Sequence, residues 1–550
     1  MPDTPALIAP DGRVIDPRYI DAVRQSAQAN VPGQPRWNAR DGMFPYRAGD
    51  LFGREVADWH PWIRSPDSEI NLHRDRMVAR QRDLVRNDGW ASGGVDRIVD
   101  NTIGASFRLM AEPDYMALGR EDKRLDETWA VEFSEAVEAE WRMWADDVGC
   151  YCDSMRQLDI TGIFRLALRS DLIDGESLIY LQWLPEFVGS YGARYATTAL
   201  LVDSDRLSNP YQDRDTATMR GGVEIDAAGA PVAYHMRREE QNDYYNALES
   251  MVWDRLPRET TWKRPIIVHG FEKERATQHR GVGLMAAVLP RFKMLGIYDQ
   301  TELEQAVQQA AIRTFITAPF HDEIENVLKV DGAADYQYDR ADYHRRINLS
   351  IGGARIPALY PGENITTVQD DAKKSFAEFE AAVLRSIAAR MGLSEGQLTQ
   401  DYSRTNYSSA RSALLESWKT LYRRRGTFVR RTVSPIYTAW LEEALSTRLR
   451  NVMPRNAPFF PEWRTAYARA DWLGPPRGWV DPVKERQGAV LGLDAGFSTL
   501  KRECAEQGLD YKQVIRQRGI EVKMMTAEGL QLPDWAGMPA QEVEMKPEPQ

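Results

Sequence analysis

Three long helical patterns constrain the fold of this 550-residue chain most. The first covers residues 292–317, a length of about 40 Å in an α-helix, and it is polar on most of its surface. So thin an apolar stripe is typical of a helix that packs against copies of itself or bridges domains. The second covers residues 369–391, where apolar residues recur at spacings of three and four. Residues 319–366 between them hold turns and short strand patterns, so we expect a stalk that carries a small cap.

The third and longest helical pattern, at residues 408–447, has one apolar sector and one basic sector. Eight lysines or arginines and a single acid, Glu416, lie between Arg404 and Arg431. The basic sector fits two interpretations, a face paired with acidic neighbours or a surface that contacts phosphates without reading sequence. We expect Pro435 to kink this helix. The basic side chains of the sector are Lys419, Arg423, Arg424, Arg430 and Arg431.

A polar loop, DYSRTNYSSAR at residues 401–411, leads into the third helix. Arg404 in this loop could touch backbone phosphates, and Ser408 or Ser409 could cap the N-terminus of the helix. The loop can contact phosphates and cap the helix at the same time. The layout suits a surface that slides along a polyanion better than a pocket that performs chemistry.

Residues 67–290 combine helical and strand patterns, which predicts an α+β domain built on a mostly antiparallel sheet. Apolar residues at helical spacing mark three helices, and short runs of strand-forming residues bounded by turn residues mark the strands. We expect helices at residues 67–100, 128–145 and 159–171, strands at 177–184, 199–207 and 264–271, and a hairpin of 222–226 with 231–237.

Composition limits the class of protein. The net charge of −11 argues against a free-standing nucleic-acid binder that works by bulk attraction. Three cysteines, Cys150, Cys152 and Cys504, make neither a disulfide framework nor a closed zinc site. No signal peptide and no membrane-spanning apolar run is visible, so we expect a soluble protein made and kept in a cytoplasm.

No catalytic constellation emerges from the sequence, so we expect no enzyme, cofactor or metal site. The motif G-L-S-E-G around Ser394 matches a nucleophile elbow, but a helix precedes it, and all seven histidines lie before it. We therefore expect Gly392 to end that helix. Gly281 and Gly283 lack the third glycine of a dinucleotide fingerprint. Neighbouring carboxylates are expected to be solvated charges at helix ends: Asp370, Asp371, Glu442 and Glu443.

Five blocks, taken together and in order, resemble the lambda-type portal proteins of tailed bacteriophages. The resemblance covers residues from about 70 to 515. The blocks are QHRGVGLMAAVLPRFK (278–293), PGE (361–363), LRSIAARMGLSEGQLTQDYSRTNYSSARSALLESW (384–418), Pro435-Ile436-Tyr437 with Trp440-Leu441, and WLGPPRGWVDPVKE (472–485).

The resemblance implies a dodecameric ring at one capsid vertex, through which double-stranded DNA is packaged and ejected. It implies a portal fold with a mixed α/β wing, a stem of long helices, a small clip containing β-structure and a helical crown. The implied regions are an N-terminal arm (1–66), the wing (67–290), a first stem helix (291–318), the clip (319–366), a second stem helix (367–392), a tunnel loop (393–407), a long basic amphipathic helix at the base of the wing and crown (408–449), and the crown with a disordered acidic tail (450–550).

The resemblance also implies partners and a surface that faces DNA. Besides copies of itself and non-specific double-stranded DNA, these partners are the terminase large subunit, major capsid and scaffold proteins, and head–tail connector or adaptor proteins. The chain would reside in the virion after assembly in the cytoplasm of a host bacterium, with no membrane partner. The alternative is a capsid- or baseplate-associated structural adaptor without a DNA channel. Residues expected to approach the channel are Gln400, Tyr402, Arg404, Asn406, Lys373 and Lys374.

Overall fold

The computed structural model divides the chain into two compact units, Met1–Arg64 and Ser65–Gln550, and the second is described below. The residues that the structure describes are 58–312 without 242 and 244, nine positions between 342 and 356, and 373–533 without 404, 405, 477, 479 and 480. Most of the expected N-terminal arm and clip, together with the acidic tail, Asp370 and Asp371, lies outside the described residues.

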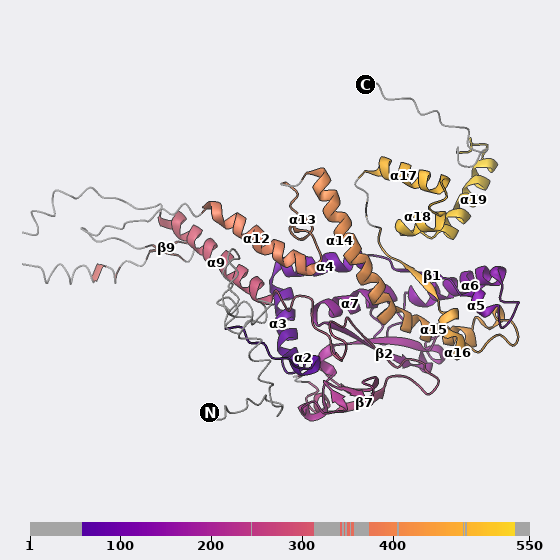
Figure 1. Cartoon of the computed structure of the whole chain (residues 1–550), viewed down its shortest axis with the longest axis horizontal. Helices are drawn as coiled ribbons and strands as arrows, with labels where there is room; N and C mark the ends of the chain where they lie inside the picture. Colours follow the sequence, from indigo (N-terminus) through magenta and orange to yellow (C-terminus); the bar gives the residue numbers. More distant parts are fainter. Residues whose placement is uncertain are drawn as a thin grey trace, which may run out of the picture. The chain divides into compact units, whose positions relative to one another are not determined.

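Two antiparallel sheets form the β-structure of the region expected to be α+β (Figure 1). One has the strand order β3-β2-β8, with β2 (Glu176–Trp183) between β3 (Thr197–Val202) and β8 (Ile267–Phe271). The mixed fold and the antiparallel pairing are confirmed, but the strands divide between two sheets instead of one. The second sheet has the order β4 (Met219–Arg220), β5 (Val223–Ile225), β6 (Pro231–Arg237) and β7 (Trp253–Pro257), and it contains the expected hairpin.

Two further strand pairs lie outside these sheets. Strand β1 (Arg108–Ala111) pairs with β11 (Ala470–Leu473), across some 360 residues of chain. Strands β9 (Leu349–Ile351) and β10 (Ala354–Ile356) form a hairpin within the segment expected to contain short strands. The β1–β11 pair ties the C-terminal part of the chain to its N-terminal helices.

The first helical region is divided by capping residues. The expected helix at 67–100 is three helices, α2 (Pro66–Ile70), α3 (Arg74–Asn87) and α4 (Gly89–Thr102). Asp88 is extended between the last two, and its carboxylate accepts a hydrogen bond from Ala91 N. Helices α6 (Glu127–Ala145) and α7 (Ile160–Ile173) confirm the other two expected helices. The short helices α5 (Tyr115–Leu118) and α8 (Pro185–Gly189) were not expected.

An aromatic cluster forms the centre of the core. Trp141 on α6 lies edge-on to Trp440, with ring centroids 5.0 Å apart, and it also contacts Tyr437 and Trp472. Edge-to-face pairs of this kind add stability beyond the apolar area they bury. The Pro435–Leu441 sequence block is therefore a core element.

The three long helical patterns are confirmed as helices. Helix α9 (Leu289–Ile312) runs beside α12 (Lys373–Met391), where the Tyr298 ring lies 5.1 Å from that of Phe379 (Figure 1). The third pattern consists of α14 (Tyr407–Phe428), a π-helical turn (Val429–Val433) and α15 (Ser434–Ser446). At the position where a kink was expected, the helix contains this π-helical turn, which ends two residues before Pro435.

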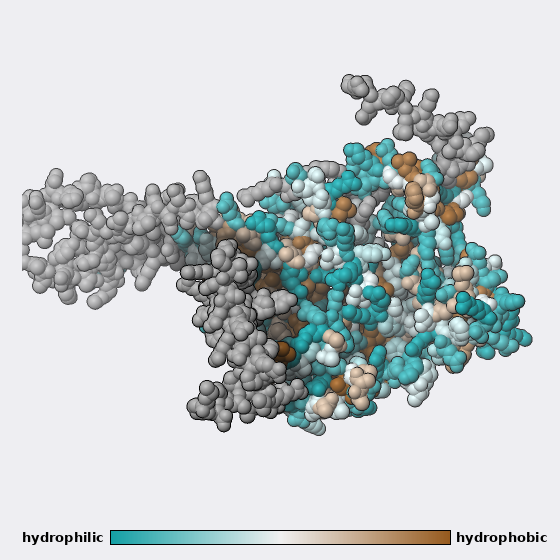
Figure 2. Space-filling view, in the orientation of Figure 1, coloured by the Kyte–Doolittle hydropathy of each residue, from teal (hydrophilic) through white to brown (hydrophobic). Residues whose placement is uncertain are grey.

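The C-terminal helices pack less closely against the rest of the chain than the helices of the core do. They are α16 (Phe460–Tyr467), α17 (Pro482–Asp494), α18 (Leu500–Glu506) and α19 (Tyr511–Ala527). Within the described part of the chain, α17 and α19 bury no side chain. Figure 2 shows apolar residues on the surface over these helices, where Leu491 and Phe497 are exposed. Among the described helices, none has the length and apolar character that a bilayer crossing requires.

Candidate functional site

The loop expected to face DNA begins where α12 ends. Gly392 ends α12 with a φ of +74°, which confirms its expected role as a helix terminator. A Cβ added there would lie 2.7 Å from Thr420 Cγ2 on α14. The end of α12 therefore packs closely against α14, and any larger residue would push the two helices apart.

Helix α13 (Glu395–Thr399) follows directly, and its sequence explains why it forms. Ser394 Oγ accepts a hydrogen bond from Gln397 N at 3.2 Å, and Gln397 Oε1 accepts one from Ser394 N at 2.9 Å. This reciprocal pair is a capping box. Leu398 is buried against Gly94 on α4, beside Met391. Ser394 thus caps a helix in the place where a nucleophile elbow would need a strand-to-helix turn.

The loop between α13 and α14 is fixed at both ends. Gln400 takes a left-handed conformation, and its Nε2 donates to Gln397 O at 3.1 Å. Asn406 Oδ1 accepts from Ser409 N at 2.8 Å and caps α14. The expectation that Ser408 or Ser409 is the cap is therefore wrong, because the amide of Asn406 reaches the free N–H groups first. Between these anchors Tyr402 is 48% exposed.

The structure brings some of the predicted site residues together and separates others. Gln400, Tyr402 and Asn406 share this one loop, and Arg404 in the same loop lies outside the described residues. Lys373 and Lys374 are the first residues of α12, about 27 Å from its C-terminal end at the rise of an α-helix. Within one chain, the two lysines therefore begin α12 at the end far from this loop.

The basic sector of α14 divides into residues with different roles. Arg423 lies 2.5 Å from Glu272 and Lys419 lies 2.7 Å from Glu416, so these two follow the interpretation of a face paired with acids. Arg424 is buried. Arg430 and Arg431 belong to the π-helical turn and line a surface hollow.

Arg425 is a structural cation that the periodicity of the helix did not single out. Its guanidinium donates to the backbone carbonyls of Thr102 at 2.8 Å and of Asn101 and Pro475 at 3.0 Å. Burial lowers the pKa of Arg425 to about 10. Arg425 satisfies carbonyls at the end of α4 and fixes the start of the C-terminal region against α14.

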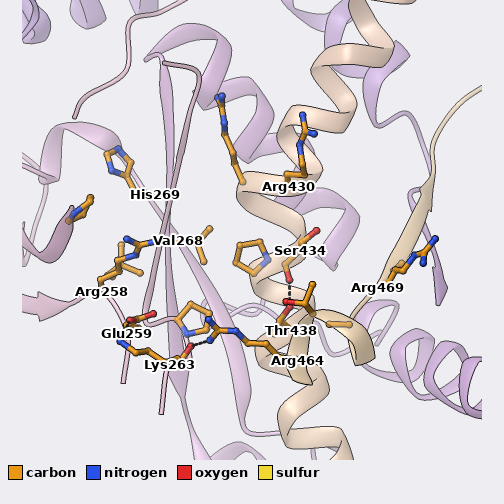
Figure 3. Close-up of a pocket in the computed structure, with 18 of the residues that line it drawn as sticks. Arg258, Glu259, Lys263, Val268, His269, Arg430, Ser434, Thr438, Arg464 and Arg469 are labelled. Atoms are coloured by element: carbon orange, nitrogen blue, oxygen red, sulfur yellow. Dashed lines mark hydrogen bonds and ion pairs between the residues drawn. The ribbon is translucent and has the colours of Figure 1, made fainter. Parts of the chain in front are cut away.

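The surface hollow lies between the strands and the helices α15 and α16, with a volume of about 1130 Å³ (Figure 3). Lys263 and Glu259 lie on the strand side, 2.7 Å apart, and Arg464 donates to the backbone carbonyl of Lys263. Positive charge predominates in its lining. Its cationic residues are Arg258, Lys263, Lys273, Arg430, Arg431, Arg464 and Arg469, against the acids Asp114, Glu259 and Glu462.

Comparison with known proteins identifies the family. The sequence profile described as "Phage portal protein, lambda family" matches residues 52–425. The chain is 32% identical to portal protein B of Escherichia phage lambda over 534 residues, which is 92% of this chain and 96% of the relative. The chain belongs to the lambda family of phage portal proteins. The resemblance of the five sequence blocks is thereby confirmed.

Other portal proteins and solved structures are also similar to the chain. The portal protein of Escherichia phage N15 is 32% identical over 501 residues, covering 89% of this chain and 91% of the relative. The structure titled "Virion of native gene transfer agent (GTA) particle" covers 88% of this chain and 99% of its own, at a TM-score of 0.39 and 14% identity. As a portal protein, the chain is a structural component of a virion.

A buried ionic cluster contains Arg280, which belongs to the first sequence block of this portal protein. Arg74, Arg280 and His269 lie 2.7, 2.6 and 3.0 Å from the carboxylate of Glu176. Burial alone would raise the pKa of Glu176, but Arg280 and Arg74 hold it well below its usual range. The cluster joins α3, β2, β8 and the segment before α9, so Arg280 is structural.

One carboxylate group among the described residues has the spacing of a metal site. Oxygen atoms of Asp203, Asp205 and Glu240 lie within 4.8 Å of one another. Arg82 Nη2 already lies 2.9 Å from Asp205 Oδ1, and Arg82 Nη1 lies 3.8 Å from Asp203 Oδ2. Arg206 Nη1 lies 3.7 Å from Glu240 Oε1, so each of the three carboxylates already has an arginine partner, and the arrangement forms ion pairs as it stands.

Proposed function

We propose that this portal protein assembles into a ring at one capsid vertex and forms the channel through which double-stranded DNA is packaged and ejected. The observation that carries the proposal is the similarity to the lambda portal protein over 92% of this chain and 96% of that protein. A match that extends over nearly the whole of both chains supports a common architecture. The proposed ring is a dodecamer, and the chain itself performs no catalysis.

The proposal assigns each region a set of the described elements. The wing (67–290) contains both main sheets, and α9 and α12 form the stem on either side of the clip (319–366). The tunnel loop (393–407) includes α13 and the loop capped by Asn406. Helices α17 to α19 belong to the crown.

The surface of α9 supports a role between subunits. Met294, Ile297 and Leu303 are 71%, 57% and 62% exposed in the single chain. A helix that exposes such side chains is expected to bury them against another surface. In the proposed ring that surface is the stem of a neighbouring copy.

The loop between α13 and α14 supports weak contact with DNA. Its ends are fixed by Gln400 and Asn406, Tyr402 between them is exposed, and its sequence includes Arg404. A few basic groups on a chain with a net charge of −11 attract phosphates only weakly, which lets DNA move. Lys373 and Lys374 would approach the channel at a different height, because they begin α12.

The proposed partners follow from the same assignment. The clip would meet the terminase large subunit during packaging and head–tail connector proteins afterwards. The outer surface of the ring would contact major capsid and scaffold proteins. Assembly would take place in the cytoplasm of a host bacterium.

An exchange of the loop tests the proposal. Residues 401–405 are replaced by a glycine–serine linker of equal length, which keeps the anchors Gln400 and Asn406. We expect rings to assemble normally by native mass spectrometry, whereas the amount of DNA retained in particles falls. Tyr245→Ala, at a tyrosine that is 96% exposed, serves as the control and should change neither readout. Loss of the ring, or unchanged DNA retention in the loop variant, would contradict the assignment.

A further inference from the structure

A second cavity lies next to the hollow of Figure 3, and Phe271, Lys273 and Arg431 line both. Its volume is about 410 Å³. It lies among α7, the end of β8, the end of α12 and the C-terminal half of α14, all of which contribute lining residues. The family assignment gives this cavity no role.

The cavity contains an excess of unpaired positive charge. Five cationic and three acidic residues line it. Two pairs neutralise each other, Arg423 with Glu272 at 2.5 Å and Arg390 with Glu274 at 3.0 Å. Four other charged residues line the cavity, and within the described part of the chain none of them has an ion-pair partner. They are Lys273, Arg424, Arg431 and Asp171.

Arg424 is the residue that points to a ligand. It is only 9% exposed, and its Nη1 is buried without a hydrogen-bond partner among the described residues. The neighbouring Arg425 is equally buried, but its guanidinium is satisfied by three backbone carbonyls. A buried guanidinium with a free donor is costly, because it loses its water and gains no acceptor.

The carboxyl group of Asp171, which also lines the cavity, does not neutralise Arg424. Burial raises the pKa of Asp171 to about 7, so this group is partly protonated near neutral pH. Burial, followed by the charge of Arg423, lowers the pKa of Arg424 to about 10, which still leaves the guanidinium charged. The cavity therefore carries net positive charge, and the incompletely hydrogen-bonded Arg424 is one of its lining residues.

We infer that this cavity binds a phosphate group, with Arg424 as the principal ligand and Arg431 and Lys273 as further cationic ligands. The planar fork of a guanidinium matches two phosphate oxygens, and hydrogen bonds between charged groups are the strongest of their kind. The phosphate is either free inorganic phosphate or part of a DNA backbone, since both present the same oxygens. This site goes beyond the proposed channel, and its test does not depend on the ring.

Calorimetric titration of the purified full-length protein with sodium phosphate, at constant ionic strength, tests the inference. We expect the wild-type protein to bind phosphate and Arg424→Met to bind it about tenfold more weakly or worse, as loss of a charged hydrogen bond predicts. Lys419→Met removes an exposed cation of the same helix, which is paired with Glu416, and should leave phosphate binding unchanged.

Two further measurements separate a binding defect from misfolding and identify the source of the phosphate. In buffer without phosphate, Arg424→Met should unfold at the same temperature as wild type or higher, because a buried unpaired cation has been removed. Competition by a short DNA duplex would assign the site to backbone phosphate, and lack of competition would assign it to free phosphate. No binding by the wild-type protein up to about 10 mM phosphate, or equal binding by Arg424→Met, would overturn the inference.

Discussion

The carboxylate of Glu443 accepts a hydrogen bond from the backbone N–H of Thr197, 246 residues away in the chain, at 2.9 Å. It also accepts from Thr197 Oγ1 at 2.5 Å and from Ala196 N at 2.7 Å. Glu443 is only 5% exposed, so the expectation of a solvated helix-end charge is wrong for this residue. The carboxyl group instead attaches α15 to the first residue of β3, and these three hydrogen bonds satisfy its buried oxygen atoms.

Removing this carboxylate should destabilise the fold. Glu443→Ala leaves three buried donors without an acceptor, and we expect a loss of about 2–4 kcal/mol of unfolding free energy. Glu442→Ala, at the neighbouring position, removes only a partly exposed ion pair with Arg264 and should change stability by less than about 1 kcal/mol. Chemical denaturation at one fixed protein concentration compares the two. Equal effects would show that Glu443 does not anchor β3.

Gly281 and Gly283 allow the backbone of the G-V-G segment to pass close to the backbone of residues 173–175. A Cβ at Gly281 would lie 1.9 Å from Gly175 O, and one at Gly283 would lie 2.2 Å from Ile173 O. Gly281→Ala should therefore cost about 3 kcal/mol or more. Gly426→Ala on α14 meets no atom within 4 Å and should stabilise the protein by about 0.5–1 kcal/mol. Thermal unfolding distinguishes the variants, and a tolerated Gly281→Ala would refute the crossing.

Glu138 should make stability depend on pH. Burial raises its pKa to about 7, and its Oε1 accepts a hydrogen bond from Ala111 N. The unfolded chain holds this proton only below about pH 4.3. Below about pH 4.3 the carboxyl group is protonated in both the folded and the unfolded chain, and the stability of the fold is highest with respect to this group. As pH rises from about 4.3 to about 7, the unfolded chain releases the proton first, so the free energy of unfolding falls progressively.

Glu138→Gln tests this dependence. We expect the variant to be more stable than wild type by about 1–3 kcal/mol at pH 8 and nearly equal to it at pH 4.5. Glu127→Gln, on the exposed first turn of the same helix, should show no such divergence. A stability difference for Glu138→Gln that is independent of pH would show that the carboxyl titrates normally in the folded protein.

Ser394 should matter for stability and not for chemistry. Ser394→Ala removes the capping box of α13 and should cost about 1 kcal/mol. Ser394→Asp keeps a capping acceptor and should restore most of that stability. DNA packaging should be unchanged in both variants, and loss of packaging in a stably folded Ser394→Asp protein would reopen a chemical role for the hydroxyl.

Local patterns in the sequence predicted most of the elements. Helical patterns placed α6, α7, α9 and α12 to within a few residues at most of their described ends, and in α6 and α12 the pattern is the apolar spacing that packing against a core requires. The turn residues around Gly229 placed the β5–β6 hairpin for a similar local reason. The family was evident from blocks whose residues prove to be structural, such as Arg280 and Trp440.

Contacts between distant segments could not be predicted in this way. The pairing of β1 with β11 depends on residues 360 positions apart, and neither strand has a pattern that names its partner. The role of Glu443 is hidden for the same reason, because a carboxylate in a helix is ordinarily exposed. Among the site residues, the cap at Asn406 was missed because two serines nearby fit the same role.

Native mass spectrometry of the purified protein, with electron-microscopy class averages of the same sample, tests the central claim most directly. The account predicts a closed ring of about twelve copies with an axial hole, because the exposed apolar residues of α9 require neighbouring copies to cover them. A stable monomer or dimer at every salt concentration, or a closed assembly without an axial opening, would contradict the account and favour a structural adaptor.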